Sequence, residues 1–408
     1  MRLARMLAVS SVMVFAFTSL ALADSSGRIY GKLTTVDGDV FEGLIRWDKN
    51  EASWVDILHG NKELPRKRRR RYRDRERSIK IFGISISRYR ERDESGMAQS
   101  GVSFGHIKTL EVTDDNAVLL TLKSGHTVEL ESGSTDIGRS IRGLIIEDRN
   151  EGEVEFDWSD VASIDFMQGD SNLKSTFGKR LYGTLTTRRD DKYTGWVCWD
   201  VDELVTQDVL DGKQKHRKRK IKFGKIKSIE RNNSKSARVT LKDDDEIVLR
   251  GTNDVDDSNR GIVIYVEGFG QVKVDWDEFD RLEFESPPSP VKYDEFGGGH
   301  RLEGIVYTED GDQYGGWIRW DDDEEYTWEF LDGNFRGVEY DIEFGNIKEI
   351  KRKGYSSSIV TLWDGHSFRL KGTNDVDEDN KGIFIELDNG EEIEIDWGEF
   401  NRIEFTRK

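Results

Sequence analysis

The chain has 408 residues, of which 35% are hydrophobic and 35% charged, and its formal net charge at pH 7 is -18. Its eleven Trp residues and regularly spaced apolar positions exclude a disordered chain and favour well-solvated folded domains. The single cysteine, Cys198, excludes an internal disulfide framework, so stability must come from packing.

Residues 1–23 are typical of a secretory signal peptide. Arg2 and Arg5 precede a mostly apolar stretch, and Ala21-Leu22-Ala23 forms a small-x-small cleavage pattern before Asp24. The alternative is a membrane anchor, but the apolar stretch is short for a span of roughly 20 residues. We therefore expect a secreted or periplasmic protein that has no transmembrane segment once the signal is removed.

Three copies of one pattern follow. They begin with RIYGKLTTVDGDVFEGLIRWD at Arg28, RLYGTLTTRRDDKYTGWVCWD at Arg180 and RLEGIVYTEDGDQYGGWIRWD at Arg301. Each copy closes on a related passage, such as DWDEFDRLEF from Asp275. Because repetition at a fixed period indicates tandem units, we predict domains at 28–166, 178–285 and 300–408, called copies one, two and three below. A Pro- and Gly-rich linker at 286–299 should act as a semi-rigid spacer.

Strand signals dominate each copy and predict an all-β fold. Asp-Gly pairs at Gly38, Gly311 and Gly365 lie between alternating apolar residues, the pattern of β-hairpins. Each copy also divides into a front half and a back half, which in copy two end at 221–230 and 274–284. Both endings predict a strand, a one-turn break and a final strand. This pattern resembles the closing segment of SH3-like and Sm-like small barrels, a likeness of architecture that implies a pair of such barrels in each copy.

The second strand of each copy has two distinct faces. Tyr193, Val197 and Trp199 alternate on one face, and the other copies have residues of the same kind there, so we predict that this face is core. The opposite face carries Trp196 in copy two and Trp317 in copy three. These two could stack on a sugar or a peptide, the alternative being packing against the other half-barrel.

Acidic loops are candidate calcium ligands. In copy three, Asp375, Asp377 and Asp379 follow the spacing of the first ligands of an EF-hand loop, but Asn380 replaces the turn glycine. The corresponding residues of copy two are Asp254 and Asp256, whereas copy one retains only Asp136. An Asx-rich turn is the alternative interpretation. A further acidic run, WDDDEE at 320–325, is expected to be a solvated loop.

Copy one contains a basic insertion at about 61–95, with 14 Lys or Arg against 6 Asp or Glu. Arginine clusters bind phosphates and carboxylates through paired hydrogen bonds, so an anionic partner could bind there, the alternative being a solvated loop. The candidate ligand-binding residues are Arg68, Arg69, Arg70 and Arg71. Export argues against intracellular nucleic acid as the partner. Copy two has a second basic run, KQKHRKRKIK, from Lys213.

No histidine pair, nucleophile motif or phosphate-binding loop indicates catalysis. We therefore expect an exported, non-catalytic binding or scaffolding protein without a resident cofactor, whose partner is a protein or a cell-envelope polymer. One alternative is a calcium-dependent or carbohydrate-binding surface module. The other is a hydrolase that uses a carboxylate pair.

Overall fold

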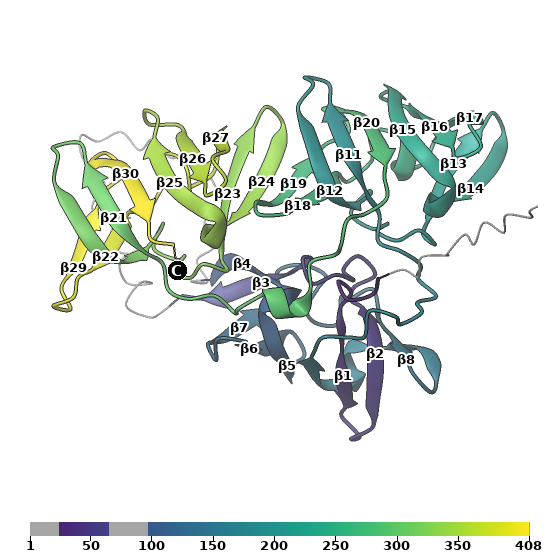
Figure 1. Ribbon diagram of the computed structural model, residues 1–408, viewed down its shortest axis with the longest axis horizontal. Coiled ribbons are helices and arrows are strands. Elements are labelled where there is room, and N and C mark those ends of the chain that lie inside the picture. Colours follow the sequence, from purple (N-terminus) through teal and green to yellow (C-terminus); the bar gives the residue numbers. More distant parts are fainter. Residues whose placement is uncertain (1–23, 65–96, 408) are drawn as a thin grey trace, which may run out of the picture.

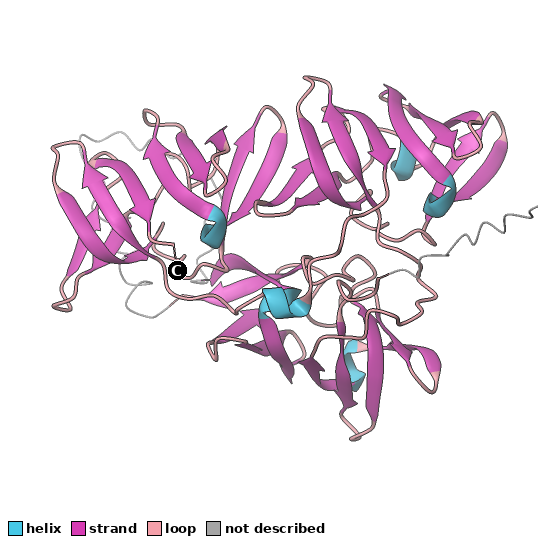
Figure 2. Cartoon of the chain, viewed as in Figure 1, coloured by secondary structure: helices cyan, strands magenta, loops and turns pink. Residues whose placement is uncertain are grey.

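The computed structural model describes residues 24–64 and 97–407 of the chain. The fold is all-β, as predicted: the described residues form thirty strands in three antiparallel sheets of 10, 12 and 8 strands, joined by loops and one-turn 3-10 helices (Figures 1 and 2). Within the described ranges, no helix is both long and apolar enough to cross a bilayer.

Each copy contributes ten strands. Copy one contains β1 (Tyr30–Thr35), β2 (Val40–Arg46), β3 (Ile57–Glu63), β4 (Met97–Ser103), β5 (Ile107–Asp114), β6 (Ala117–Leu122), β7 (Thr127–Glu131), β8 (Leu144–Asp148), β9 (Gly152–Phe156) and β10 (Val161–Phe166). Copy two contains β11 (Tyr182–Thr187), β12 (Lys192–Cys198), β13 (Val209–Gln214), β14 (Arg217–Lys222), β15 (Ile226–Asn233), β16 (Ser236–Leu241), β17 (Glu246–Arg250), β18 (Ile262–Val266), β19 (Gly270–Val274) and β20 (Phe279–Phe284). Copy three contains β21 (Glu303–Thr308), β22 (Gln313–Arg319), β23 (Phe330–Phe335), β24 (Val338–Glu343), β25 (Ile347–Arg352), β26 (Ser358–Leu362), β27 (Ser367–Leu370), β28 (Ile383–Glu386), β29 (Glu392–Ile395) and β30 (Phe400–Phe405). The one-turn helices are η1 (Phe104–His106), η2 (Trp158–Asp160), η3 (Phe223–Lys225), η4 (Asn253–Val255), η5 (Tyr293–Glu295) and η6 (Phe344–Asn346).

The strand order shows that the two halves of a copy are nested, not consecutive. In copy one the order is β4-β3-β7-β6-β5-β10-β1-β2-β8-β9, and copy two repeats it from β14 to β19. The first two strands and the last three form an outer group of five, whereas the five middle strands form an inner group. The predicted strand endings of the two halves lie side by side, because β5 pairs with β10 and β15 with β20.

The predicted core face is confirmed. Trp47, Trp199 and Trp320 have no exposed surface, and each packs edge-on against a second tryptophan from the closing passage of its copy. Each indole Nε1 also donates to a backbone carbonyl of the acidic loop, at 2.9–3.0 Å. A buried indole N–H needs such an acceptor, so this bond fixes the loop against the core.

Copies two and three share a sheet. The β23–β24 hairpin of copy three extends the sheet of copy two, because β24 pairs with β19 over five residue pairs. Gly270 makes the close approach possible: a Cβ at this position would lie 2.2 Å from the backbone oxygen of Asp341. In Figure 1 these two copies form the upper layer, and copy one lies below them.

The linker between copies two and three is docked on copy one instead of running free as a spacer. Tyr293 and Phe296 are buried in the apolar cluster of copy one. The hydroxyl of Tyr293 donates to the Ile107 carbonyl at 2.9 Å, and Lys123 Nζ donates to the Tyr293 carbonyl at 2.6 Å. The linker therefore fixes copy one beneath the other two copies.

Candidate functional site

A tight turn follows the buried tryptophan of each copy and carries acidic side chains. The turn is closed by bridges between Trp47 and Glu51 and between their counterparts in the other copies. Its first two residues have positive φ in all three copies, including 56° at Val201, where a β-branched residue is unfavourable. Because this strained backbone recurs in all three copies, we infer that the turn holds its acidic side chains at fixed positions.

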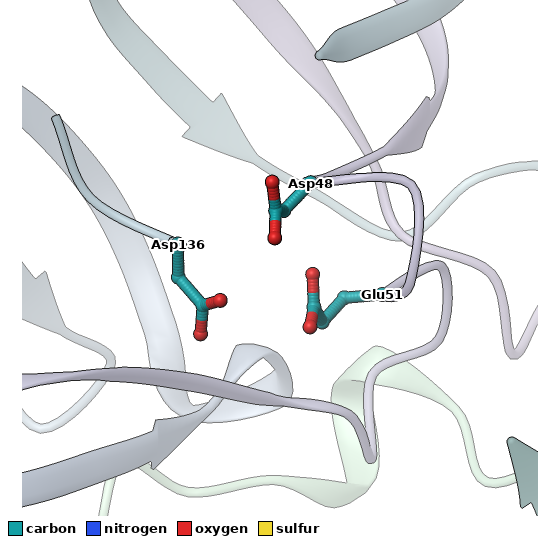
Figure 3. A group of neighbouring side chains, drawn as sticks. All are labelled: Asp48, Glu51 and Asp136. Carbon is teal, nitrogen blue, oxygen red and sulfur yellow. The ribbon is translucent and has the colours of Figure 1, made fainter. Parts of the chain in front are cut away.

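Three carboxyl groups converge at this turn, and we call them the carboxyl triad. The turn aspartate is Asp48, Asp200 or Asp321, the turn glutamate is Glu51, Glu203 or Glu324, and the loop aspartate is Asp136, Asp254 or Asp375. All of them are buried except Glu203, which is partly exposed. Among the described residues, only the triad of copy one brings one oxygen from each group within 4.8 Å of the others (Figure 3).

The two aspartates of each triad are already bound. Asp200 accepts hydrogen bonds from the backbone N–H of Arg260 at 2.6 Å and from its guanidinium at 3.0 Å, and Asp48 is bound in the same way by Arg142. The loop aspartate accepts a backbone N–H from the third strand, as Asp254 does from Asp211 at 2.5 Å. These aspartates therefore connect the turn, the acidic loop and the third strand of a copy.

The turn glutamate differs because one of its oxygens, Oε2, is buried without a hydrogen-bond partner in all three copies. Burial, followed by the charges of Asp254 and Asp202, raises the pKa of Glu203 to about 9. The pKa values of Glu51 and Glu324 are also raised well above the usual range, again mainly by burial. A carboxyl group in this position must either carry a proton or face a cation.

His59 makes the triad of copy one different from the other two. Its backbone N–H and its ring Nδ1 both lie near Asp136 Oδ2, at 2.8 and 3.2 Å. Burial would lower the pKa of His59, but the hydrogen bond to Asp136 and the negative charges of Asp136 and Asp341 together raise it. Copies two and three have Asp211 and Asp332 at this position, so only the first triad has an imidazole beside it.

A second repeated acid, which we call the cap acid, joins the copies to one another. It is Asp56 in copy one, Asp208 in copy two and Glu329 in copy three. One oxygen accepts two backbone N–H groups of the cap acid's own turn, as Asp208 Oδ2 does from Leu204 and Val205 at 2.8 and 3.0 Å. The carboxylate also binds a cation from another copy in each case.

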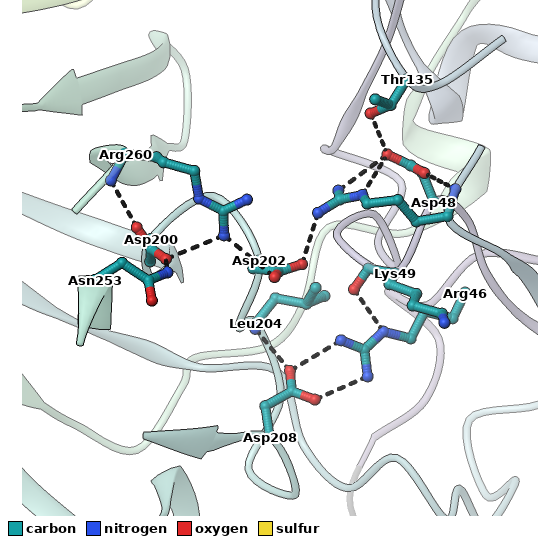
Figure 4. A network of polar contacts seen from close by, with 11 residues as sticks. Arg46, Asp48, Lys49, Thr135, Asp200, Asp202, Leu204, Asp208, Asn253 and Arg260 are labelled. Atoms are coloured by element: carbon teal, nitrogen blue, oxygen red, sulfur yellow. Dashed lines mark hydrogen bonds and ion pairs between the residues drawn. The ribbon is translucent and has the colours of Figure 1, made fainter. Parts of the chain in front are cut away.

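Copies one and two exchange these ion pairs reciprocally. Arg46 of copy one binds Asp208 of copy two through two guanidinium N–H groups at 2.8 and 3.1 Å (Figure 4). In return, Arg180 of copy two binds Asp56 of copy one. Arg142 adds a bond to Asp202 at 2.8 Å. The Arg46 and Asp208 side chains are each 13% exposed, so this pair is shielded from salt.

Copy three is bound to copy one by Lys62, which lies on β3. Its Nζ donates to Glu329 and to the backbone oxygen of Asp323. Burial would lower the pKa of Lys62, but the charges of Glu329 and Asp323 raise it, so the ammonium group stays charged. Ser103 adds a bond to Glu343 at 2.6 Å.

The predicted calcium residues are divided between two environments. Asp254 and Asp375 belong to the carboxyl triads, as described above. Asp256 and Asp377 accept the backbone N–H groups of Ser258 and Asp379, each two residues on, which is the geometry of an Asx turn. The loop aspartates thus converge with the acids after Trp199 and Trp320, and not with the next acidic residues of their own loop.

The predicted stacking residues are covered to different extents. Trp196 is only 8% exposed and belongs to the apolar cluster of copy one, with its ring 5.2 Å from that of Tyr182. Trp196 therefore fills the junction between copies, and so it has no free face in this structure. Trp317 is half-buried, and the guanidinium of Arg301 lies 5.3 Å from its ring centre.

The expectation of a solvated loop at WDDDEE is wrong. Asp321, Asp322, Asp323 and Glu324 are all buried. Asp321 and Glu324 belong to the carboxyl triad of copy three, and Lys62 of copy one contacts the backbone oxygen of Asp323. Sequence reasoning missed the turn glutamates and the cap acids. The sequence pattern that could have identified the turn glutamates is Trp-Asp-x-x-Glu, which begins at Trp47, Trp199 and Trp320 in the three copies.

The basic insertion connects β3 and β4, and the basic run of copy two forms the β13–β14 hairpin at the same place. Arg68, Arg69, Arg70 and Arg71 lie outside the described residues. Comparison with protein-family models, curated proteins and solved structures found no match for this chain.

Proposed function

We propose that the protein is an exported, non-catalytic scaffold that holds three β domains in a fixed arrangement and binds protein or cell-envelope polymer partners on its surface. The signal-like N-terminus supports export. The two groups of five strands in each copy support a pair of SH3-like or Sm-like barrels per domain.

The observation that carries this proposal is the repeated cap acid. In each copy its carboxylate stabilises its own turn and also binds Arg180, Arg46 or Lys62 of another copy. Domains on flexible tethers would not need such bonds, whereas a scaffold benefits when its binding surfaces keep fixed spacings. The buried linker and the shared sheet of copies two and three also fix the copies relative to one another.

The distribution of acidic groups favours this function over a hydrolase. A catalytic carboxylate pair is needed once, but the triads recur at equivalent positions in all three copies. The loop aspartate accepts a backbone N–H from the third strand in each copy. A contact that recurs at the equivalent position of all three copies is explained by a structural role in the fold.

The test compares capture of partners by the intact mature chain and by a loosened variant, Arg46→Gln with Arg180→Gln. Small-angle X-ray scattering would verify that the copies have separated, and Arg238→Gln, at an exposed position, is the control. Partners taken from exported proteins and cell-envelope polymers should bind the loosened variant about tenfold more weakly, since avidity depends on spacing. Equal capture by both proteins would refute a function based on fixed spacing, and glycan or ester hydrolysis lost in Glu203→Gln would refute a non-catalytic one.

A second candidate function is calcium binding by the triad of copy one. The unpartnered Oε2 of Glu51 favours it, because the Glu51 carboxyl lies beside those of Asp48 and Asp136 in a set of hard oxygen ligands (Figure 3). The opposing factor is Arg142, which already supplies positive charge to Asp48.

Calcium titration of thermal unfolding tests this candidate. With calcium at about 10 mM, above the ~1 mM dissociation constant of weak extracellular sites, the melting temperature should rise. Glu51→Gln should abolish the rise, while Glu203→Gln should leave it unchanged, since only the first triad has the close geometry. No rise in the intact chain would eliminate the calcium site.

A further inference from the structure

The contact between β19 and β24 provides a template for a contact between molecules. It joins the last hairpin of copy two to a hairpin of copy three, pairing Gln271 with Asp341 and Lys273 with Glu339. On one face, Lys273 Nζ lies 3.3 Å from Glu339 Oε2, and Gln271 Nε2 donates to Asp341 at 2.9 Å. Polar pairs of this kind flank a continuous antiparallel ladder.

Both strands of this template have counterparts at the ends of the sheets. In copy two, the counterpart of β24 is β14, which is one of the two edge strands of the 12-stranded sheet. In copy three, the counterpart of β19 is β29, the last strand of the 8-stranded sheet. Figure 1 shows β14 and β29 at opposite ends of the long axis of the molecule. A second copy could therefore add to either end in the way that copy three adds to copy two.

The two end strands carry opposite charges. In β14, which reads RKRKIK, every residue except Ile221 is exposed. In β29, which reads EIEI, Glu392 and Glu394 are exposed. Transferring the register of the template places Lys218 opposite Glu394 and Lys220 opposite Glu392. Opposite charges at directly facing positions stabilise an antiparallel pair, and like charges destabilise it.

We propose that β29 of one molecule pairs antiparallel with β14 of a second copy, so that the protein associates head to tail. This interface is heterologous, so each added molecule presents a new β29 or β14 to the next one. The inference goes beyond the scaffold function, which requires no self-association.

The template also sets the extent and the strength of the proposed contact. Glu391 stands where Gly270 allows close approach, so the transferable pairing covers only the four residues of β29. The buried pair of Val272 with Tyr340 becomes Ile393 with Arg219, and the contact therefore depends more on charge. Charged side chains commonly prevent an edge strand from pairing with other chains. Here they would allow pairing only with an edge strand of opposite charge.

One other strand carries the same acidic pattern. In β9 of copy one, Glu153 and Glu155 occupy the positions of Glu392 and Glu394. Thr176, in the segment between copies one and two, contacts Glu153 at 3.3 Å, and Lys49 pairs with Glu155 at 3.4 Å. Glu392 of β29 is also paired, with Arg319 at 2.9 Å, so these contacts do not distinguish the two strands. We assign the partner strand to β29 because it continues the layer formed by copies two and three and lies opposite β14 along the long axis.

Sedimentation velocity of the full mature chain tests the proposal across a concentration series. The intact protein should form dimers and larger species that dissociate when NaCl is raised from about 0.05 M to about 0.5 M. The variants K218E/K220E and E392K/E394K should each associate about tenfold or more weakly, since both make the facing strands alike in charge. A mixture of the two variants should regain association, because each then offers an edge complementary to the other.

K348E/K351E is the control. It makes the same change in net charge at exposed positions of β25 and should associate like the intact protein. A chain that remains monomeric in low salt would overturn the proposal and leave the β14 charges as a guard of the edge. Association abolished by E153K/E155K but not by E392K/E394K would overturn it in favour of β9.

Discussion

Replacing Glu203 with glutamine should make the protein more stable at neutral pH. The Glu203 carboxyl has a pKa of about 9 in the folded protein, against its ordinary value of 4.5, because it is buried and lies among other carboxylates. Between these two values the folded state holds a proton that the unfolded state releases. The free energy of unfolding therefore falls as pH rises from 4.5 to 9. At pH 7 the loss amounts to about 3 kcal/mol, because the slope rises from half its full value at pH 4.5 to ~1.4 kcal/mol per pH unit about one unit higher.

Glutamine has nearly the same shape but no titratable proton, so Glu203→Gln should remove this dependence. Denaturant unfolding at several pH values, in buffer with a chelator, would measure it. The stability gained by the variant should grow by about 3 kcal/mol between pH 4.5 and pH 7. Glu246→Gln, at an exposed position, should show no such growth. A gap between Glu203→Gln and the unmodified chain that stays constant with pH would refute a protonated Glu203 in the folded state.

Three other predictions concern the junctions between copies. A double-mutant cycle of Arg46→Gln and Asp208→Asn should give a coupling free energy of about 1–3 kcal/mol, because the pair is bidentate and shielded; a value near zero would contradict this. Tyr293→Ala should expose the linker to limited proteolysis without unfolding the domains, whereas an unchanged cleavage pattern would show that the linker does not need this anchor. Gly270→Ala should lower the melting temperature by more than Gly268→Ala. Both glycines have positive φ, but only a Cβ at position 270 would meet the backbone of a neighbouring strand. Equal losses of stability would contradict close packing at β19.

Local features of the fold could be predicted from the sequence because they depend on neighbouring residues. The hairpins at Gly38, Gly311 and Gly365 are present, with φ between 89° and 95° at these glycines. The alternating faces of the second strand also identified the buried tryptophans correctly. Both predictions rest on patterns that span only a few residues.

The features that escaped prediction depend on residues far apart in the chain. WDDDEE has the composition of a solvated loop, but Asp321 is buried against Lys381 and Asn374 of its own copy, and Lys62 of copy one contacts Asp323. The linker reads as a spacer because its partners, among them Lys123 and Ile107, form no motif in copy one. Asp254 and Asp375 were predicted as part of a site, but the turn glutamates that join them were missed for the same reason, since the acidic loop and the turn after the tryptophan are separate in sequence and meet only in the fold.

The nested strand order also constrains when each domain can be completed as the chain is synthesised. In copy two, Gly183 pairs with Phe284, so the first strands of the outer group must wait until the last strand has been made. The inner group, β13 to β17, is contiguous and can form earlier, because local pairing closes shorter loops. A copy truncated before its final strand would keep a foldable centre but leave β11 without one of its two neighbours, exposing an edge to other chains. Such a fragment would thus aggregate instead of forming a smaller folded domain.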